Sequence, residues 1–236
     1  MKNSKSLQLM PESRRSILTV LKRKGPQSIA SLARNLGITP EGIRQQLGQL
    51  QHEGWVRREV KRKPSAAGRP PSHYRLTPAG DHLFPKEYDE LAVALIDAAA
   101  EELGPQALRR LLERVARDKV QRWEPQLKGL DLPDRLRALR GIYRTGDPYC
   151  YVESGENSHH RLVEMNCPYL EVARRRPALC SVTVSVLRRL LGREVVRTER
   201  FQAGHGRCVF RIFEDRRREP DSPLFDWEPE SWEQEG

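Results

Sequence analysis

The sequence predicts an α+β protein in which helical and strand-rich stretches follow one another along the chain. Apolar residues recur at helical spacing over residues 14–52 and again over residues 91–142. After Gly146 the pattern changes to short strand-like segments that surround two helices. From residue 214 the chain carries nine acidic residues against three basic ones, which favours disorder. The expected parts are an N-terminal domain, a helical region, a small α+β domain and a disordered acidic tail, at residues 1–82, 83–145, 146–213 and 214–236.

The positive charge of the chain is concentrated in its first third. Residues 1–77 hold 16 Lys and Arg against 4 Asp and Glu, whereas the remainder holds 26 against 28. This distribution is typical of a phosphate-binding domain joined to a neutral one. No apolar run reaches the roughly 18 residues of a membrane span, and Met1–Met10 is too polar for a secretion signal. We therefore expect a cytoplasmic protein with no membrane contact and with reduced cysteines.

Residues 28–50 predict a helix-turn-helix. Apolar residues occupy one face over residues 29–36, and Gly37 ends that helix. Thr39 is expected to cap the next helix, with Pro40 at its first position. The face of this helix that points away from the core carries Arg and Gln, which suit paired hydrogen bonds to base edges. A merely solvated helix face is the alternative. The predicted base-reading positions are Thr39, Glu41, Arg44, Gln45 and Gly48.

A basic loop between two predicted strands completes a winged helix-turn-helix. Residues 55–60 and 73–76 read as strands, and the eleven-residue loop 61–71 between them is rich in Lys, Arg, Gly and Pro. We expect this wing to contact phosphates, with Arg69 suited to a narrow minor groove. The wing residues assigned to DNA are Lys61, Arg62, Lys63 and Arg69. Such domains usually read pseudo-symmetric double-stranded DNA as dimers, so we expect an operator-binding homodimer that uses the central helices.

Three cysteines lie at junctions between predicted elements of the C-terminal part. They are Cys167, Cys180 and Cys208, and their spacing lacks the Cys-x-x-Cys pairs of a zinc knuckle. Iron–sulfur clusters tolerate wider spacing of their thiolates. From spacing alone, metal or cluster binding, core packing and thiol redox switching all remain open. Neighbouring arginines, Arg174, Arg175, Arg176 and Arg207, are expected to lower the pKa of these thiols.

The C-terminal part resembles the SufR family of iron–sulfur-cluster-dependent repressors. The resemblance is carried by residues 162–168, 172–173 and 177–180, and by residues 190–197 and 208–210. With the wing, it extends over most of residues 12–213. It implies a [4Fe–4S] cluster bound by Cys167, Cys180 and Cys208, a homodimer, and repression of iron–sulfur assembly genes.

The fourth cluster ligand is left open by the sequence. Some related sequences have a cysteine three residues after the first ligand, where this chain has Leu170. The remaining candidates are Cys150, for which the alternative is a buried core role, and His159, His160 and His205, for which it is a surface or turn role. Another non-cysteine ligand or a small molecule is a further option for completing the site.

Two other functions compete with the cluster-dependent repressor. A thiol-based or zinc-based regulator would use the same cysteines without iron. An enzyme is not expected, because the chain has no phosphate-binding loop, His-Glu-x-x-His helix or Gly-x-Ser-x-Gly turn.

Overall fold

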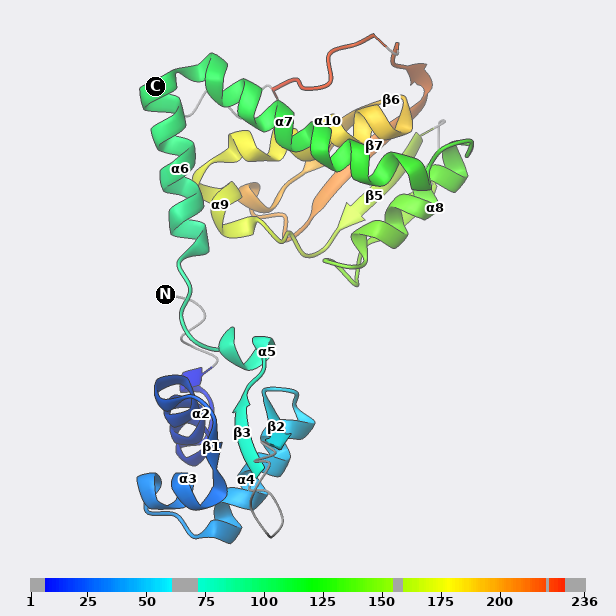
Figure 1. Cartoon of the computed structure of the whole chain (residues 1–236). Helices are drawn as coiled ribbons and strands as arrows, with labels where there is room; N and C mark the ends of the chain where they lie inside the picture. Colours follow the sequence, from blue (N-terminus) through cyan, green and yellow to red (C-terminus); the bar gives the residue numbers. More distant parts are fainter. Residues whose placement is uncertain (1–6, 61–71, 155–158, 220, 228–236) are drawn as a thin grey trace. The chain divides into compact units, whose positions relative to one another are not determined.

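The computed structural model describes residues 7–60, 72–154, 159–219 and 221–227 (Figure 1). The chain forms two compact units, Met1–Glu87 and Tyr88–Gly236, which are described separately. Each unit combines helices with an antiparallel sheet, so the α+β prediction is confirmed. Within the described ranges, none of the helices has the length and apolar character to cross a membrane.

The first unit is a small helical domain with a three-stranded sheet. Its strands lie in the order β1-β3-β2, and β3 pairs antiparallel with both neighbours. One apolar core joins its helices to the sheet, with Ile17, Leu32, Ile43 and Leu50 fully buried. The elements are α2 (Glu12–Lys24), β1 (Gln27–Ser28), α3 (Ile29–Leu36), α4 (Pro40–His52), β2 (Val56–Val60), β3 (Ser72–Leu76) and α5 (Pro78–Asp81).

Local sequence signals define the turn between α3 and α4. The hydroxyl of Ser28 accepts a hydrogen bond from Ser31 N at 3.2 Å and begins α3. Gly37 ends α3 in the left-handed region with φ 65°, where a residue with a side chain is strained. The hydroxyl of Thr39 then accepts a hydrogen bond from Gly42 N at 3.2 Å. The predicted helix-turn-helix is therefore present.

A close backbone approach fixes α5 against the start of β2. A Cβ atom added to Gly80 would lie 2.0 Å from the carbonyl oxygen of Trp55. Thr77 secures the same corner, because its backbone N–H donates to Trp55 O at 3.0 Å and its hydroxyl donates to Gly54 O at 2.6 Å. Only glycine fits at position 80 without moving the chain.

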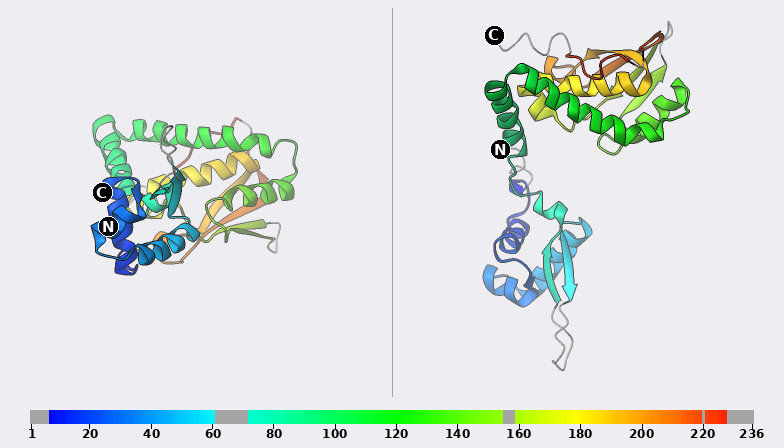
Figure 2. Two further views of the ribbon diagram at one scale, coloured as in Figure 1. Left: turned by 60° about the horizontal axis from the view of Figure 1, so that its bottom comes forward. Right: turned by 45° about the horizontal axis from the view of Figure 1, so that its top comes forward.

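The second unit is a four-stranded antiparallel sheet with helices packed on it (Figures 1 and 2). The strand order is β4-β5-β7-β6, so β7 is central although it comes last in the chain. Helices α6 (Tyr88–Leu103), α7 (Pro105–Trp123) and α8 (Leu132–Tyr143) precede the sheet. The other elements are η1 (Glu124–Gln126), β4 (Tyr151–Ser154), β5 (His159–Glu164), α9 (Leu170–Arg175), η2 (Pro177–Leu179), α10 (Cys180–Leu191), β6 (Arg193–Glu199), η3 (Phe201–Ala203) and β7 (Cys208–Arg217).

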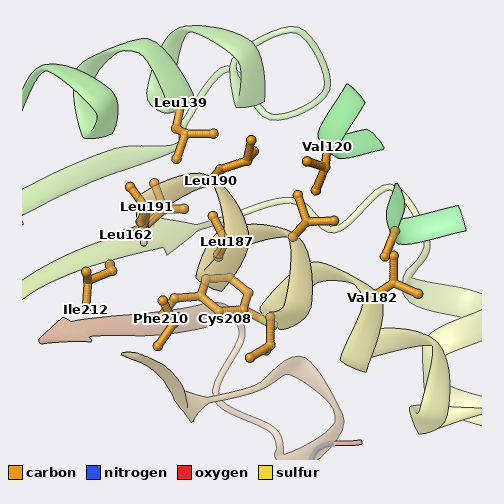
Figure 3. Close-up of a cluster of buried hydrophobic side chains, with 14 of the residues drawn as sticks. Val120, Leu139, Leu162, Val182, Leu187, Leu190, Leu191, Cys208, Phe210 and Ile212 are labelled. Carbon is orange, nitrogen blue, oxygen red and sulfur yellow. The ribbon is translucent and has the colours of Figure 1, made fainter. Parts of the chain in front are cut away.

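Helix α10 is the centre of the second core. It packs on β6, and both α7 and α8 pack against it. Figure 3 shows Leu187 and Leu190 of α10 in one cluster with Leu139 of α8 and with Phe210 and Cys208 of β7. The central helices α7 and α8 are thus part of the core of the C-terminal unit.

The acidic C-terminal segment differs from the expected disordered tail. Strand β7 continues to Arg217, and Phe225 is only 1% exposed within the second core. The ring of Phe225 packs edge-on to Trp227 at 5.1 Å, and Arg109 Nη2 donates to the Phe225 carbonyl at 3.1 Å. Buried aromatic area therefore offsets the cost of ordering an acidic segment. Residues 228–236 lie outside the described part.

Candidate DNA-reading helix and cysteine cavity

Helix α4 has one buried face and one open face. Ile43, Leu47 and Leu50 are at most 1% exposed and anchor the helix to the core. The predicted base-reading residues lie on the opposite, exposed side: Thr39, Glu41, Arg44, Gln45 and Gly48. A Cβ added to Gly48 would meet no atom within 4 Å, so this part of the helix is open to a close neighbour. The helix has the form that a major groove accepts.

Charged contacts orient the open face of α4. Arg44 Nη1 forms an ion pair with Glu41, one helical turn away, and both side chains are largely exposed. Such an exposed pair is weak, so the guanidinium remains available to another hydrogen-bond acceptor. Near the other end of α4, Arg14 Nη1 of α2 donates to Glu53 Oε1 at 2.8 Å. The predicted wing contacts Lys61, Arg62, Lys63 and Arg69 lie outside the described residues.

In the second unit, one small cavity brings the three cysteines together. Cys167 precedes α9, Cys180 is the first residue of α10, and Cys208 is the first residue of β7. The cavity is about 20 Å³ in volume, roughly the space of one water molecule. All three cysteines are free thiols. The residues that line the cavity are Glu164, Cys167, Leu170, Cys180, Thr183, Arg197, Phe201, Gln202, Cys208 and Phe210.

The described residues that line this cavity do not form a site for a single metal ion. Among the residues that the structure describes, no three His, Cys, Asp or Glu side chains are arranged to hold a single metal ion. Burial raises the pKa of Cys167 to about 12 and that of Cys208 to about 11. These two thiols are therefore protonated at neutral pH in the metal-free protein, and each must lose its proton to bind a metal.

The expected electrostatic role of the neighbouring arginines is wrong, because those arginines pair with carboxylates. Arg175 Nη1 lies 2.8 Å from Glu90 Oε2, and Arg207 Nε lies 2.6 Å from Glu199 Oε2. Arg174 and Arg176 also form ion pairs, with Glu171 and Asp97. The arginine at the cavity is Arg197 instead. It is only 6% exposed and favours the thiolate form of Cys208, although burial dominates the pKa.

A carboxylate on the sheet lies at the same cavity, which the sequence analysis missed. Glu164 on β5 is the register partner of Cys208 on β7, so both side chains leave the same face of the sheet. Glu164 is only 7% exposed, and burial raises its pKa to about 7, with the charge of Asp147 adding to the effect. The alternation of side chains along β5 could have predicted that Glu164 faces inward. Leu162 and Glu164 share one face of the strand, and Leu162 is a core residue.

Gln202 in η3 provides a polar contact to a cysteine sulfur. Its Nε2 donates to Cys180 Sγ at 3.1 Å and to the Ala173 carbonyl at 3.2 Å. Its Oε1 is buried and has no hydrogen-bond partner within the described residues. A buried unpaired acceptor is costly and marks a place where another group is expected.

The cysteine and histidines proposed as fourth ligands lie away from the cavity lining. Cys150 is buried in the second core among apolar side chains. His159 and His160 lie in β5 opposite Phe213 and Ile212, and Nδ1 of His205 accepts a hydrogen bond from Arg200 N at 3.1 Å. Leu170 does line the cavity, at the position where some related sequences have cysteine.

A buried carboxylate holds the loop that leads into Cys167. Asp147 is 1% exposed and accepts hydrogen bonds from the backbone N–H groups of Met165 at 2.6 Å and Asn166 at 2.9 Å. It also accepts from Tyr149 N at 3.0 Å. These contacts position Cys167 at the end of β5.

Comparison with known proteins identifies the first of these two sites. Residues 10–57 match a family described as winged helix-turn-helix DNA-binding. This segment contains α2, α3 and α4. No curated protein matches the chain by sequence. The N-terminal unit therefore matches winged helix-turn-helix DNA-binding domains over residues 10–57.

Solved structures share only limited likeness with the chain. The transcriptional regulator PA4135 is 21% identical over 50% of this chain and 84% of its own, with a TM-score of 0.31. Disulfide-formed AbfR is 23% identical over 40% and 74%, with a TM-score of 0.28. A MepR variant from a multidrug-resistant S. aureus clinical isolate is 18% identical over 50% and 87%, with a TM-score of 0.30.

Proposed function

We propose that this chain is a homodimeric transcriptional repressor whose DNA binding responds to a [4Fe–4S] cluster held by Cys167, Cys180 and Cys208. The observation that carries the proposal is that three cysteines from separate elements line one cavity in a chain that also has a winged helix-turn-helix segment. Sequence resemblance to SufR repressors adds the cluster type and points to iron–sulfur assembly genes as targets. The proposed location is the cytoplasm, where thiols stay reduced.

The donor groups at the cavity suit such a cluster. Thiolates are the preferred protein ligands of iron–sulfur centres, and each iron takes its own thiolate. The three cysteines that line the cavity would each offer one thiolate to such a group. When bound, the cluster supplies redox-sensitive and iron-sensitive chemistry. The chain supplies deprotonated sulfurs, the Gln202 N–H at Cys180 Sγ and the positive charge of Arg197.

Two ion pairs offer a route from the cysteines toward the DNA-binding unit. Arg176 and Arg175, shortly before Cys180, pair with Asp97 and Glu90 of α6. Helix α6 is the first element after the N-terminal unit in the chain. A shift of the Cys180 segment on cluster loss would therefore act on α6, and a coupling of about 1–3 kcal/mol between the two sites is enough for regulation.

Exposed aliphatic side chains on α6 and α7 support the homodimer. Leu91 and Leu95 are 58% and 62% exposed one turn apart on α6, and Leu111 and Val115 have the same spacing on α7. A second copy of the chain would cover these side chains, as in other paired DNA readers. Sedimentation of the intact protein tests the homodimer. We expect the wild type to sediment as a dimer and the variant with Leu95→Glu and Leu111→Glu to sediment as a monomer.

The central experiment compares the protein with and without its cluster. Protein purified without air is analysed for iron and acid-labile sulfide, and its operator affinity is measured before and after cluster removal. We expect Cys180→Ser to lose iron, whereas Cys150→Ser, a matched change at a cysteine away from the cavity, retains it. Equal operator affinity with and without the cluster would refute the sensing role. Cysteine oxidation without bound iron would instead indicate a thiol switch.

A further inference from the structure

The cavity wall has one anionic oxygen donor besides the three thiols. The other polar lining groups are the hydroxyl of Thr183, the amide of Gln202 and the guanidinium of Arg197, which as a cation does not bind metal. Glu164 alone carries a carboxylate, and carboxylates bind iron readily. The candidates suggested by the sequence, Cys150 among them, lie away from this lining.

The backbone places Glu164 next to a cluster cysteine. Residues 164 and 208 face each other across the antiparallel pair β5·β7, where opposing Cβ atoms lie about 4.5–5.5 Å apart. Cys167 follows three residues later on the same strand end. Glu164 and these two cysteines line the same cavity.

Glu164 is a buried carboxyl group with two cationic side chains nearby. Only 7% of the residue is exposed, and the charges of Lys119 and Arg197 favour its ionised form, whereas burial and Asp147 oppose it. Buried carboxylates are almost always paired or bound to a metal, because desolvation is costly. Asp147, the nearest other buried acid, shows the usual solution with three backbone donors.

We propose that Glu164 is the fourth ligand of the cluster and binds, through a carboxylate oxygen, the iron that no cysteine holds. This inference rests on the proposed function. Iron at that corner has a harder, more weakly held ligand than the three thiolate-bound irons. It is therefore the position at which the cluster first loses iron or accepts an external ligand, while Arg197 offsets the added negative charge.

The test uses the full-length protein reconstituted without air with ⁵⁷Fe and sulfide. Mössbauer spectra of the wild type are expected to contain one iron site that differs from the other three. In Glu164→Gln this distinct signal changes, and a chelator removes iron at least ~10-fold faster. Glu164→Cys replaces the oxygen by a thiolate, so the four sites become similar and chelator resistance rises. Glu153→Gln, a change at an exposed carboxylate on β4, serves as the matched control and leaves all readouts unchanged.

The outcomes separate this inference from the proposed function. A wild-type protein that assembles no cluster overturns both. A wild-type cluster whose spectrum and chelator resistance are the same in Glu164→Gln and Glu164→Cys overturns only the assignment of Glu164. Far-ultraviolet circular dichroism of the metal-free variants verifies the fold, and Glu164→Gln is isosteric and removes a buried charge, so it is expected to fold.

Discussion

Arg176 holds Asp97 with a two-pronged ion pair that joins the cysteine-bearing segment to α6. Arg176 Nε contacts one carboxylate oxygen, and its Nη2 donates to the other at 2.6 Å. This fork geometry is the strongest arrangement of an arginine and a carboxylate. Because Cys180 lies four residues after Arg176, the position of the first turn of α10 depends on a side chain of another helix.

Removing this pair should change stability in a pH-dependent way. The hydrogen bond from Arg176 holds the pKa of Asp97 below its usual value, despite an opposing effect of burial. A depressed pKa means that the pair stabilises the fold above about pH 4 and that this stabilisation is lost as pH falls through the lowered pKa. Asp97→Asn should therefore reduce the free energy of unfolding near neutral pH, with a difference from wild type that shrinks in acid. Urea titrations over a pH series measure this.

A control for that experiment is Asp118→Asn, which breaks the exposed pair of Asp118 with Arg114 on α7. An exposed pair contributes little, so this variant should follow the wild type at every pH. A constant difference between Asp97→Asn and wild type across the series would contradict the assigned role of ionisation.

Gly80→Ala should destabilise the DNA-binding unit. The added Cβ would lie 2.0 Å from Trp55 O, so α5 must move away from the start of β2. We expect the free energy of unfolding to fall by roughly 1–3 kcal/mol. Gly48→Ala is the matched control, because its Cβ meets no atom, and it should raise stability by roughly 0.5–1 kcal/mol. Thermal unfolding of both variants tests this packing. A Gly80→Ala variant more stable than Gly48→Ala would contradict it.

Arg44→Ala should relax the choice of DNA sequence. Arg44 lies on the open face of α4, and a paired contact to a base is worth roughly 1–3 kcal/mol of discrimination. Lys61→Ala in the predicted wing should weaken all sequences alike and reduce the salt dependence of binding. Binding to an operator and to single-base variants distinguishes them. Identical behaviour of the two variants would contradict the groove assignment, and Arg114→Ala on α7 should have no effect.

Asp147→Ala should loosen the segment that carries Cys167. The substitution leaves the N–H groups of Tyr149, Met165 and Asn166 without their acceptor, and hydrogen bonds to a charged group are the stronger kind. We expect a loss of roughly 2–3 kcal/mol in unfolding free energy. Alkylation of Cys167, followed by mass spectrometry, should accelerate in the metal-free protein. Asp215→Ala, at an exposed position on β7, is the control, and unchanged alkylation would contradict this role of Asp147.

The sequence predicted the N-terminal unit well because its signals are local. Caps at Ser28 and Thr39, the glycine at position 37 and the apolar face of α4 each depend on residues a few positions apart. Strand β1 was not predicted, because a two-residue strand has no alternation to detect. The predicted loop 61–71 lies outside the described residues, so its contacts remain predictions.

The C-terminal site was only partly predictable because its partners are distant in the chain. The cysteines can be recognised from their residue type alone. Glu164 reaches the same cavity only because β5 pairs with β7 in the observed register. Gln202 reaches the cavity from the short helix η3, which no periodic pattern in the sequence predicts. Likewise, the acidity of the last residues predicted disorder, although the ring of Phe225 is buried in the second core.

Helix α10 begins at Cys180 and, seven residues later, places Leu187 at the centre of the hydrophobic core. Cluster binding, as proposed, and folding of the second unit would therefore depend on the same helix. A substitution that merely repacks the interior will also retune how firmly the inorganic group is retained, and selection on either property acts on both. Variation in α10 among relatives should accordingly track the working conditions of the sensor more closely than variation in α8, which carries none of the three cavity cysteines.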